Sequence, residues 1–165
     1  MVMIHTSSPE ETLHLGQLLA ALLKAGDVVC LCGDLGAGKT LLTKGIAAGL
    51  GVTEDVTSPT FTVLQVYEAK TPIYHFDLYR LEHADELMDI GFDEFVSGSG
   101  IAIIEWADKF SDFMPEEYLR IEIMHGATPE TRTIQVQPQG NRYESLVEEL
   151  KKIAGSCFRN VNTGF

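Results

Sequence analysis

A short run of glycines followed by a lysine and a threonine is the clearest chemical pattern in the sequence. Residues 33–40 read Gly-Asp-Leu-Gly-Ala-Gly-Lys-Thr, between an apolar segment at 28–32 and a helix-prone segment that begins at Leu41. Such glycines let a backbone wrap closely around a polyphosphate, and the positive end of the next helix adds to the attraction. The pattern predicts a nucleoside-triphosphate site. The alternative, a glycine-rich structural turn, does not require this strand–loop–helix order.

Two side chains at the end of this loop supply further chemistry. The Lys39 ammonium is expected to reach the β- and γ-phosphates, and the Thr40 hydroxyl is expected to bind Mg²⁺. The loop residues expected to bind the nucleotide are Gly33, Asp34, Leu35, Gly36, Ala37, Gly38, Lys39, Thr40 and Leu41.

A magnesium-dependent site also needs an acidic residue, usually at the end of a neighbouring strand. Residues 101–104 are apolar at every position, which is typical of a central parallel strand with both faces covered. Glu105 follows directly, so it should emerge at the carboxyl end of the sheet, where open α/β folds bind ligands. We therefore expect Glu105 to bind the magnesium ion together with Thr40, directly or through water. The alternative is a strand-end acid that faces solvent.

A second acid, Asp77, lies in a segment at 73–80 whose apolar and polar residues alternate. The alternation alone favours a half-buried strand with one face in solvent, and His75 alone indicates a structural histidine. The functional alternative makes Asp77 an acid that holds a metal-bound water or orients the attacking one. Ser58 and Thr60 either sense the γ-phosphate or simply begin a strand, and the sequence does not decide between these readings.

Composition limits the classes of function. A chain of 165 residues suits one domain, and its net charge of −12 makes autonomous tight binding to nucleic acid unfavourable. No run of 18 apolar residues and no leader-like segment occurs. The three cysteines lack the spacing of metal ligands and are expected to be free thiols in a reducing compartment. A cytoplasmic protein without membrane association is therefore predicted.

The elements that must position these residues follow from periodicity and turn residues. We expect an α/β fold with a mixed, mainly parallel sheet flanked by helices, in one P-loop domain at 1–154 followed by a flexible tail at 155–165. A helix should begin at the N-cap Ser8. The other expected elements are strands at 28–32, 62–67, 73–78, 101–104, 118–124 and 131–137, and helices after Lys39, at 82–90 and at 143–154.

Four segments in series resemble the bacterial TsaE family, formerly called YjeE. They are residues 33–40, Ser58-Pro59-Thr60-Phe61, the His75–Arg80 segment His-Phe-Asp-Leu-Tyr-Arg, and Glu105-Trp106. The resemblance covers roughly residues 8–137. It implies a P-loop domain that binds ATP with Mg²⁺ and hydrolyses it slowly when alone.

The resemblance also implies partners and residue roles. The partners are the TsaB–TsaD pair, which modifies the adenosine beside the anticodon in tRNAs that read codons beginning with A. By this resemblance Lys39 binds phosphates, Thr40 and Glu105 hold magnesium, Asp77 is important for turnover, and Trp106 lies beside the nucleotide. The tRNA would be held mainly by the other subunits.

Three other functions compete with this interpretation. A small-molecule kinase generally needs a basic lid, and the five arginines are scattered along the chain. A GTPase switch would carry an Asn-Lys-x-Asp sequence, which is absent. A scaffold with a purely structural nucleotide is the third alternative. Arg132 is a candidate for packing near the base, without a motif in its support.

Overall fold

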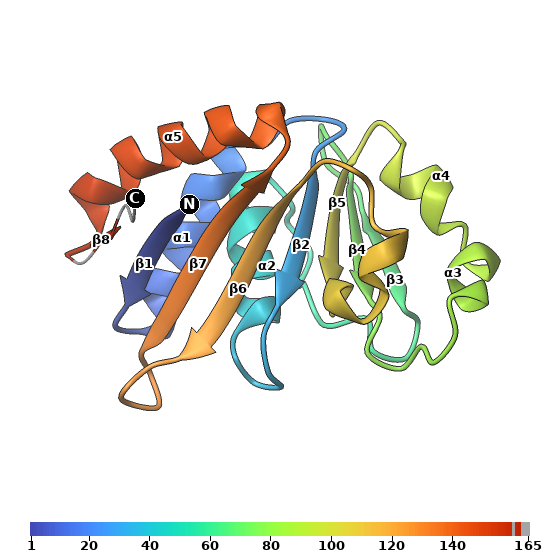
Figure 1. Cartoon of the computed structure of the whole chain (residues 1–165), viewed down its shortest axis with the longest axis horizontal. Helices are drawn as coiled ribbons and strands as arrows, with labels where there is room; N and C mark the ends of the chain where they lie inside the picture. The colour runs from blue at the N-terminus through green and yellow to red at the C-terminus, as the bar shows by residue number, and fades with distance from the viewer. Residues whose placement is uncertain (160, 163–165) are drawn as a thin grey trace.

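The computed structural model describes residues 1–159 and 161–162 of the chain. Within these residues, an eight-stranded mixed sheet forms the centre of a single α/β domain, with helices on both faces (Figure 1). The expected α/β class is confirmed. The strands lie in the order β3 (Leu64–Tyr67), β4 (Ile73–Asp77), β5 (Ile101–Glu105), β2 (Val28–Cys32), β6 (Tyr118–His125), β7 (Arg132–Gln139), β1 (Val2–Thr6) and β8 (Val161–Asn162).

Parallel pairing is confined to the middle of this sheet. Among the described strands, the pairs β4–β5, β5–β2 and β2–β6 are parallel, and the other four neighbouring pairs are antiparallel. The parallel share is thus smaller than in the mainly parallel sheet that the sequence predicted. Short turns join β3 to β4 and β6 to β7, and such connections permit only antiparallel pairing.

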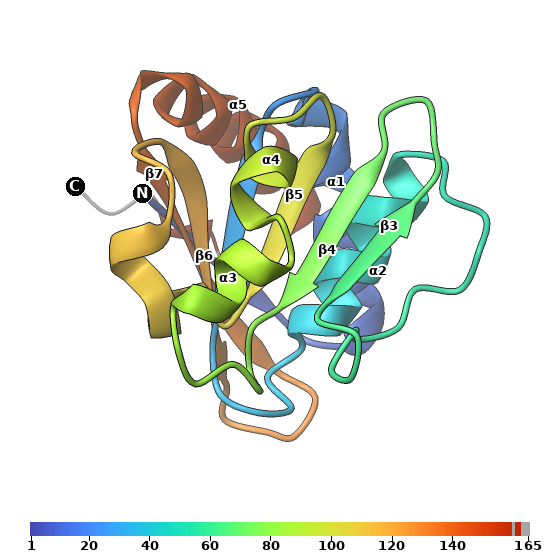
Figure 2. The same ribbon diagram turned by 90° about the vertical axis from the view of Figure 1, so that its right-hand side faces the viewer.

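Two hydrophobic cores cover the two faces of the sheet. The first core includes helices α1 (Pro9–Leu22), α2 (Lys39–Gly49) and α5 (Asn141–Cys157). The second includes α3 (Asp85–Asp89), α4 (Phe92–Val96) and the 3-10 helix η1 (Ala107–Phe113). In β2, Val29 packs in the first core and Val28 in the second. Figure 2 shows α3 and α4 on the side of the sheet opposite α1 and α2.

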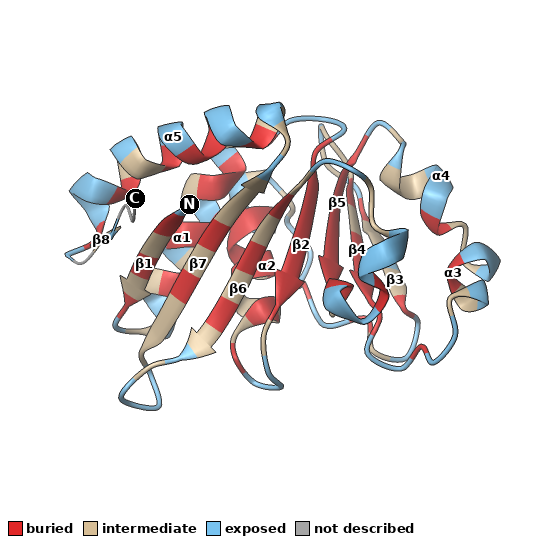
Figure 3. Cartoon of the chain, viewed as in Figure 1, coloured by how far each residue is buried: buried red, intermediate tan, exposed pale blue. Residues whose placement is uncertain are grey.

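Strands β2 and β5 are buried along their whole length, as Figure 3 shows. All five residues of β5 are buried, which confirms the expectation of a covered central strand at 101–104. In β4 the structure corrects the preferred expectation of a solvent face: His75 and Asp77 are 0% and 4% exposed. The reason is topological, because β4 pairs with β3 and β5 on its two edges and has a hydrophobic core on each face.

Helix α1 begins where its capping residues predict. The Ser8 Oγ accepts a hydrogen bond from the Glu11 N–H at 3.2 Å, and the Glu11 carboxylate accepts one from the Ser7 N–H at 2.6 Å.

Gly16 lets α1 pack closely on α2, because a Cβ at this position would lie 2.6 Å from the Leu42 carbonyl oxygen. This contact fixes α2, the helix that follows the glycine-rich loop.

The elements differ from expectation at the N-terminus, between β4 and β5, and at the C-terminus. Strand β1 and helix α4 are not predicted, and the acidic helix expected at 82–90 is reduced to α3. Helix α5 runs on to Cys157, Phe158 is buried, and β8 pairs with β1. Ordered structure therefore extends beyond residue 154, where the sequence predicted a flexible tail to begin. The remainder of the predicted tail, residues 160 and 163–165, lies outside the described residues.

Candidate functional site

The glycine-rich loop connects β2 to α2 with a backbone that requires glycine. Gly38, the cap residue of α2, has φ +114°, a left-handed conformation that a side chain disfavours. No side chain caps the helix at this position, so the first N–H groups of α2 have no side-chain partner there. N–H groups without partners and the helix dipole make the N-terminus of a helix favourable for an anion.

The Lys39 ammonium lies inside the loop. Its Nζ donates hydrogen bonds to the carbonyl oxygens of Gly33 at 2.7 Å and Asp34 at 2.8 Å, and it lies 4.3 Å from the centre of the Trp106 ring. Burial lowers the pKa of Lys39 below its ordinary value, although Glu105 and other nearby carboxylates act in the opposite direction. The Lys39 ammonium therefore lies inside the loop, at the place where the expected polyphosphate would bind.

Thr40 and Glu105 meet at the mouth of the loop. The Thr40 hydroxyl donates a hydrogen bond to Glu105 Oε1 at 3.2 Å and lies 3.5 Å from Oε2. Glu105 ends β5 and is only 2% exposed. Among the described residues, no cluster of three or more His, Cys, Asp or Glu side chains suits a metal ion. A hydroxyl and one carboxylate nevertheless fit Mg²⁺, which commonly takes one or two protein oxygens and completes its shell with water and phosphate.

Asp77 lies beside Glu105 in the sheet, since the two residues are register partners of β4 and β5. Its Oδ2 accepts hydrogen bonds from the hydroxyls of Ser58 at 2.7 Å and Thr60 at 3.3 Å, and its Oδ1 accepts one from the Tyr79 N–H at 3.0 Å. The loop that contains Ser58 and Thr60 is thus attached to a buried carboxylate rather than being only the entry to a strand.

A cavity of about 350 Å³ unites these groups. Its lining residues are Leu35, Gly36, Gly38, Lys39, Thr40, Leu41, Ser58, Thr60, Asp77, Tyr79, Glu105 and Trp106. Three residues expected at the nucleotide, Gly33, Asp34 and Ala37, do not line it. Gly33 and Asp34 instead hold Lys39 through their carbonyl oxygens, and Ala37 is buried beneath the loop.

Comparison with known proteins identifies the family. The model of "Threonylcarbamoyl adenosine biosynthesis protein TsaE" matches residues 6–134. The chain belongs to the TsaE family.

Individual relatives agree with this assignment. The TsaE protein of Bacillus subtilis is 48% identical over 89% of this chain and 92% of its own length. The TsaE protein of Treponema pallidum is 43% identical over 70% of this chain and 86% of its own length. A crystal structure of Bacillus subtilis YdiB superposes with a TM-score of 0.80 at 41% identity, covering 93% of this chain and 97% of that one.

Two basic side chains brace the segment that follows β4 in this TsaE-family chain. The Lys109 ammonium donates to the carbonyl oxygens of Tyr79 and Leu81, and Arg80 donates to the Phe61 carbonyl oxygen at 2.6 Å. The Tyr79 ring packs on the Trp106 ring, with centroids 5.0 Å apart. These contacts join the ends of β4 and β5 at the cavity.

His75 is a residue whose role its sequence does not reveal. A single histidine in an alternating strand is typical of a structural residue, but its Nε2 lies 2.6 Å from Glu105 Oε2. The signal available in the sequence was the alternation in 73–80, which puts His75 and Asp77 on one face of the strand. The register that brings this face beside Glu105 comes from the structure.

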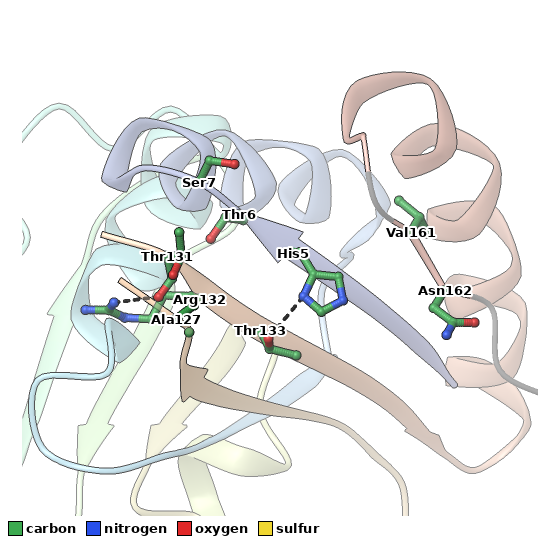
Figure 4. A pocket seen from close by; sticks show the side chains of 10 residues that line it. His5, Thr6, Ser7, Ala127, Thr131, Arg132, Thr133, Val161 and Asn162 are labelled. Carbon is green, nitrogen blue, oxygen red and sulfur yellow. Dashed lines mark hydrogen bonds between the residues drawn. The ribbon is translucent and has the colours of Figure 1, made fainter. Parts of the chain in front are cut away.

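A larger cavity, of about 550 Å³, is lined neither by the glycine-rich loop nor by Asp77 and Glu105 (Figure 4). It lies between β1, the β6–β7 turn and β8, and His5 and Thr133 form a 3.0 Å hydrogen bond on its wall. Arg132 lines it and donates from Nε to the Ala37 carbonyl oxygen at 2.7 Å. Arg132 therefore supports the loop backbone, and its expected packing near a base remains a prediction.

No helix in the described part of this TsaE-family chain is long and apolar enough to cross a membrane.

Proposed function

We propose that this chain is the magnesium-dependent ATP-binding and ATP-hydrolysing subunit of tRNA threonylcarbamoyladenosine synthesis. It acts with TsaB and TsaD to modify the adenosine next to the anticodon in tRNAs that read codons beginning with A. The observation that carries the proposal is the meeting of Thr40 and Glu105 at the mouth of the loop, in one cavity with Lys39 and Asp77. Family membership supports the biological process.

In this proposal each side chain has a distinct task. When bound, Mg²⁺ neutralises charge on the β- and γ-phosphate oxygens. Thr40 and Glu105 offer the oxygens that hold it, and Lys39 exchanges its carbonyl partners in the loop for phosphate oxygens. Trp106 lies over the Lys39 ammonium and borders the nucleotide.

Asp77 is assigned to the attacking water. Its carboxylate lies beside Glu105 in the sheet and contacts the hydroxyls of Ser58 and Thr60 rather than that of Thr40. A carboxylate in this position accepts a hydrogen bond from water and orients the water oxygen toward the γ-phosphate. Ser58 and Thr60 hold that carboxylate in place.

The partner part of the proposal rests on charge and on family membership. A chain with a net charge of −12 repels the phosphate backbone, so the tRNA is held mainly by TsaB and TsaD. A cytoplasmic location stays a prediction of the sequence.

Nucleotide binding and turnover by the isolated chain test the first part. We expect ATP to bind in preference to GTP, binding to tighten with Mg²⁺, and slow ADP release that Lys39→Ala abolishes. A preference for GTP would overturn the adenine assignment. Saturable ADP release that depends on an added metabolite would favour the alternative, a small-molecule kinase.

A further inference from the structure

A fully buried histidine lies directly behind the acid at the mouth of the loop. His75 is 0% exposed, and its near neighbours on the same face of the sheet include the apolar residues Ile73 and Ile103. A polar ring in such surroundings is unfavourable unless a partner satisfies it. Its partner is Glu105, with 2.6 Å between His75 Nε2 and Glu105 Oε2.

The two oxygens of Glu105 therefore face different groups. Oε2 is held by His75, and Oε1 is the closer acceptor for the Thr40 hydroxyl, at 3.2 Å. Because an ionised carboxylate only accepts hydrogen bonds, Nε2 is assigned as the donor. The histidine thus fixes the rotation of the carboxylate and directs one oxygen toward Thr40.

The other ring nitrogen indicates that packing alone does not account for this histidine. His75 Nδ1 is the only buried side-chain nitrogen or oxygen among the described residues that lacks a hydrogen-bond partner. A buried polar atom without a partner costs free energy, which an apolar side chain of similar size would avoid. The compensating interaction on the ring is the one with Glu105.

We propose that His75 is a positioning residue for the metal site: it orients Glu105 so that Oε1 and the Thr40 hydroxyl bind Mg²⁺ together. The inference rests on the proposed function, because it concerns the same magnesium–ATP site. Outer partners that orient metal ligands typically change metal affinity by about 10–100-fold when they are removed.

The test is the Mg²⁺ dependence of ADP binding, measured by titration calorimetry at several concentrations of free Mg²⁺ and in excess chelator. His75→Leu removes the donor but preserves bulk. His75→Gln places an amide nitrogen near the position of Nε2, whereas the amide of His75→Asn is too short to reach Oε2. Ile73→Val, a mild core change in the same strand, is the matched control.

We expect His75→Leu and His75→Asn to need at least about tenfold more Mg²⁺ for the same gain in ADP affinity. Their affinity in chelator should match that of the wild type, and His75→Gln should restore Mg²⁺ dependence to within about threefold. Ile73→Val should lower thermal stability without changing the Mg²⁺ requirement. If His75→Leu does not fold, the comparison of Gln with Asn decides.

Two results would overturn the inference alone. The first is a Mg²⁺ dependence of ADP binding in His75→Asn equal to that of the wild type. The second is a loss of ADP affinity in the His75 variants that is equally large with Mg²⁺ and in chelator. The second result would mean that His75 only supports the fold. A wild-type chain whose ADP affinity does not respond to Mg²⁺ would instead overturn the proposed metal site, and this inference with it.

Discussion

Thr40 and Glu105, 65 residues apart in the sequence, form a 3.2 Å hydrogen bond at the mouth of the glycine-rich loop. Thr40 belongs to the first turn of α2, and Glu105 ends the neighbouring strand β5. The parallel pairing of β2 with β5 brings the two ends to the same edge of the sheet. In the proposed function, this hydroxyl and this carboxylate hold the magnesium ion of a bound triphosphate.

Thr40→Ala should remove most of the effect of Mg²⁺ on nucleotide binding. The variant lacks one metal oxygen but keeps the loop backbone and Lys39, so affinity in chelator should be unchanged, while the Mg²⁺-dependent gain falls at least about tenfold. Thr40→Ser retains the hydroxyl and is the matched control. Equal Mg²⁺ titrations for Thr40→Ala and the wild type would argue against Thr40 as a ligand.

Asp77→Asn and Glu105→Gln should lower turnover more than binding. For Asp77→Asn we expect about a hundredfold slower ADP release, because an amide is a poor acceptor for the proton of the attacking water. The nucleotide affinity of Asp77→Asn, measured in the same preparation by calorimetry, should stay close to that of the wild type, whereas Glu105→Gln should also need more Mg²⁺ for the same affinity because it loses the charge of a metal ligand. If both variants keep wild-type turnover, the active site lies elsewhere.

Arg132→Gln should make the glycine-rich loop less rigid, although Arg132 lies outside the cavity of about 350 Å³ that contains the acids. The variant loses the charged hydrogen bond to the Ala37 carbonyl oxygen, an interaction of about 1.5–3 kcal/mol, which corresponds to about a tenfold or greater loss of nucleotide affinity if it preorganises the loop. The Mg²⁺ requirement should be unchanged, because Arg132 does not contact Thr40 or Glu105. A variant that binds nucleotide as tightly as the wild type would show that the loop is rigid without this arginine.

The cysteines should differ in reactivity. Burial raises the pKa of the Cys30 and Cys32 thiols, so the reactive thiolate is scarce at these positions at pH 8, whereas Cys157 is exposed at the end of α5. A thiol-specific chromogenic reagent should modify one thiol quickly in the native protein and three after unfolding. Fast modification of all three in the folded state would contradict this burial.

The chemistry of the site is more predictable from sequence than its supports. The loop at 33–40 matches the residue spacing of a phosphate-binding loop, and the apolar run before Glu105 marks a covered central strand that ends at the mouth of this loop. Both are local patterns. The burial of Asp77 is not local, since alternation in 73–80 is equally consistent with a solvent face. Only the packing of β4 between β3 and β5, with a core on each face, decides this.

Two further features required tertiary information. The contact of His75 with Glu105 depends on the register of β4 against β5, which one strand alone does not specify. Strand β1 had a signal, because Val2 and Ile4 alternate with Met3 and His5, but five residues are a weak pattern. Its place in the sheet comes from pairing with β7, more than 120 residues later.

ATP turnover by this chain, measured alone and with purified TsaB, TsaD and tRNA, tests the proposed function most directly. We expect slow turnover by the isolated chain, strong stimulation by the pair, and loss of that stimulation in Lys39→Ala. Turnover that does not respond to TsaB and TsaD, from a chain that binds magnesium and ATP normally, would contradict the proposed partnership.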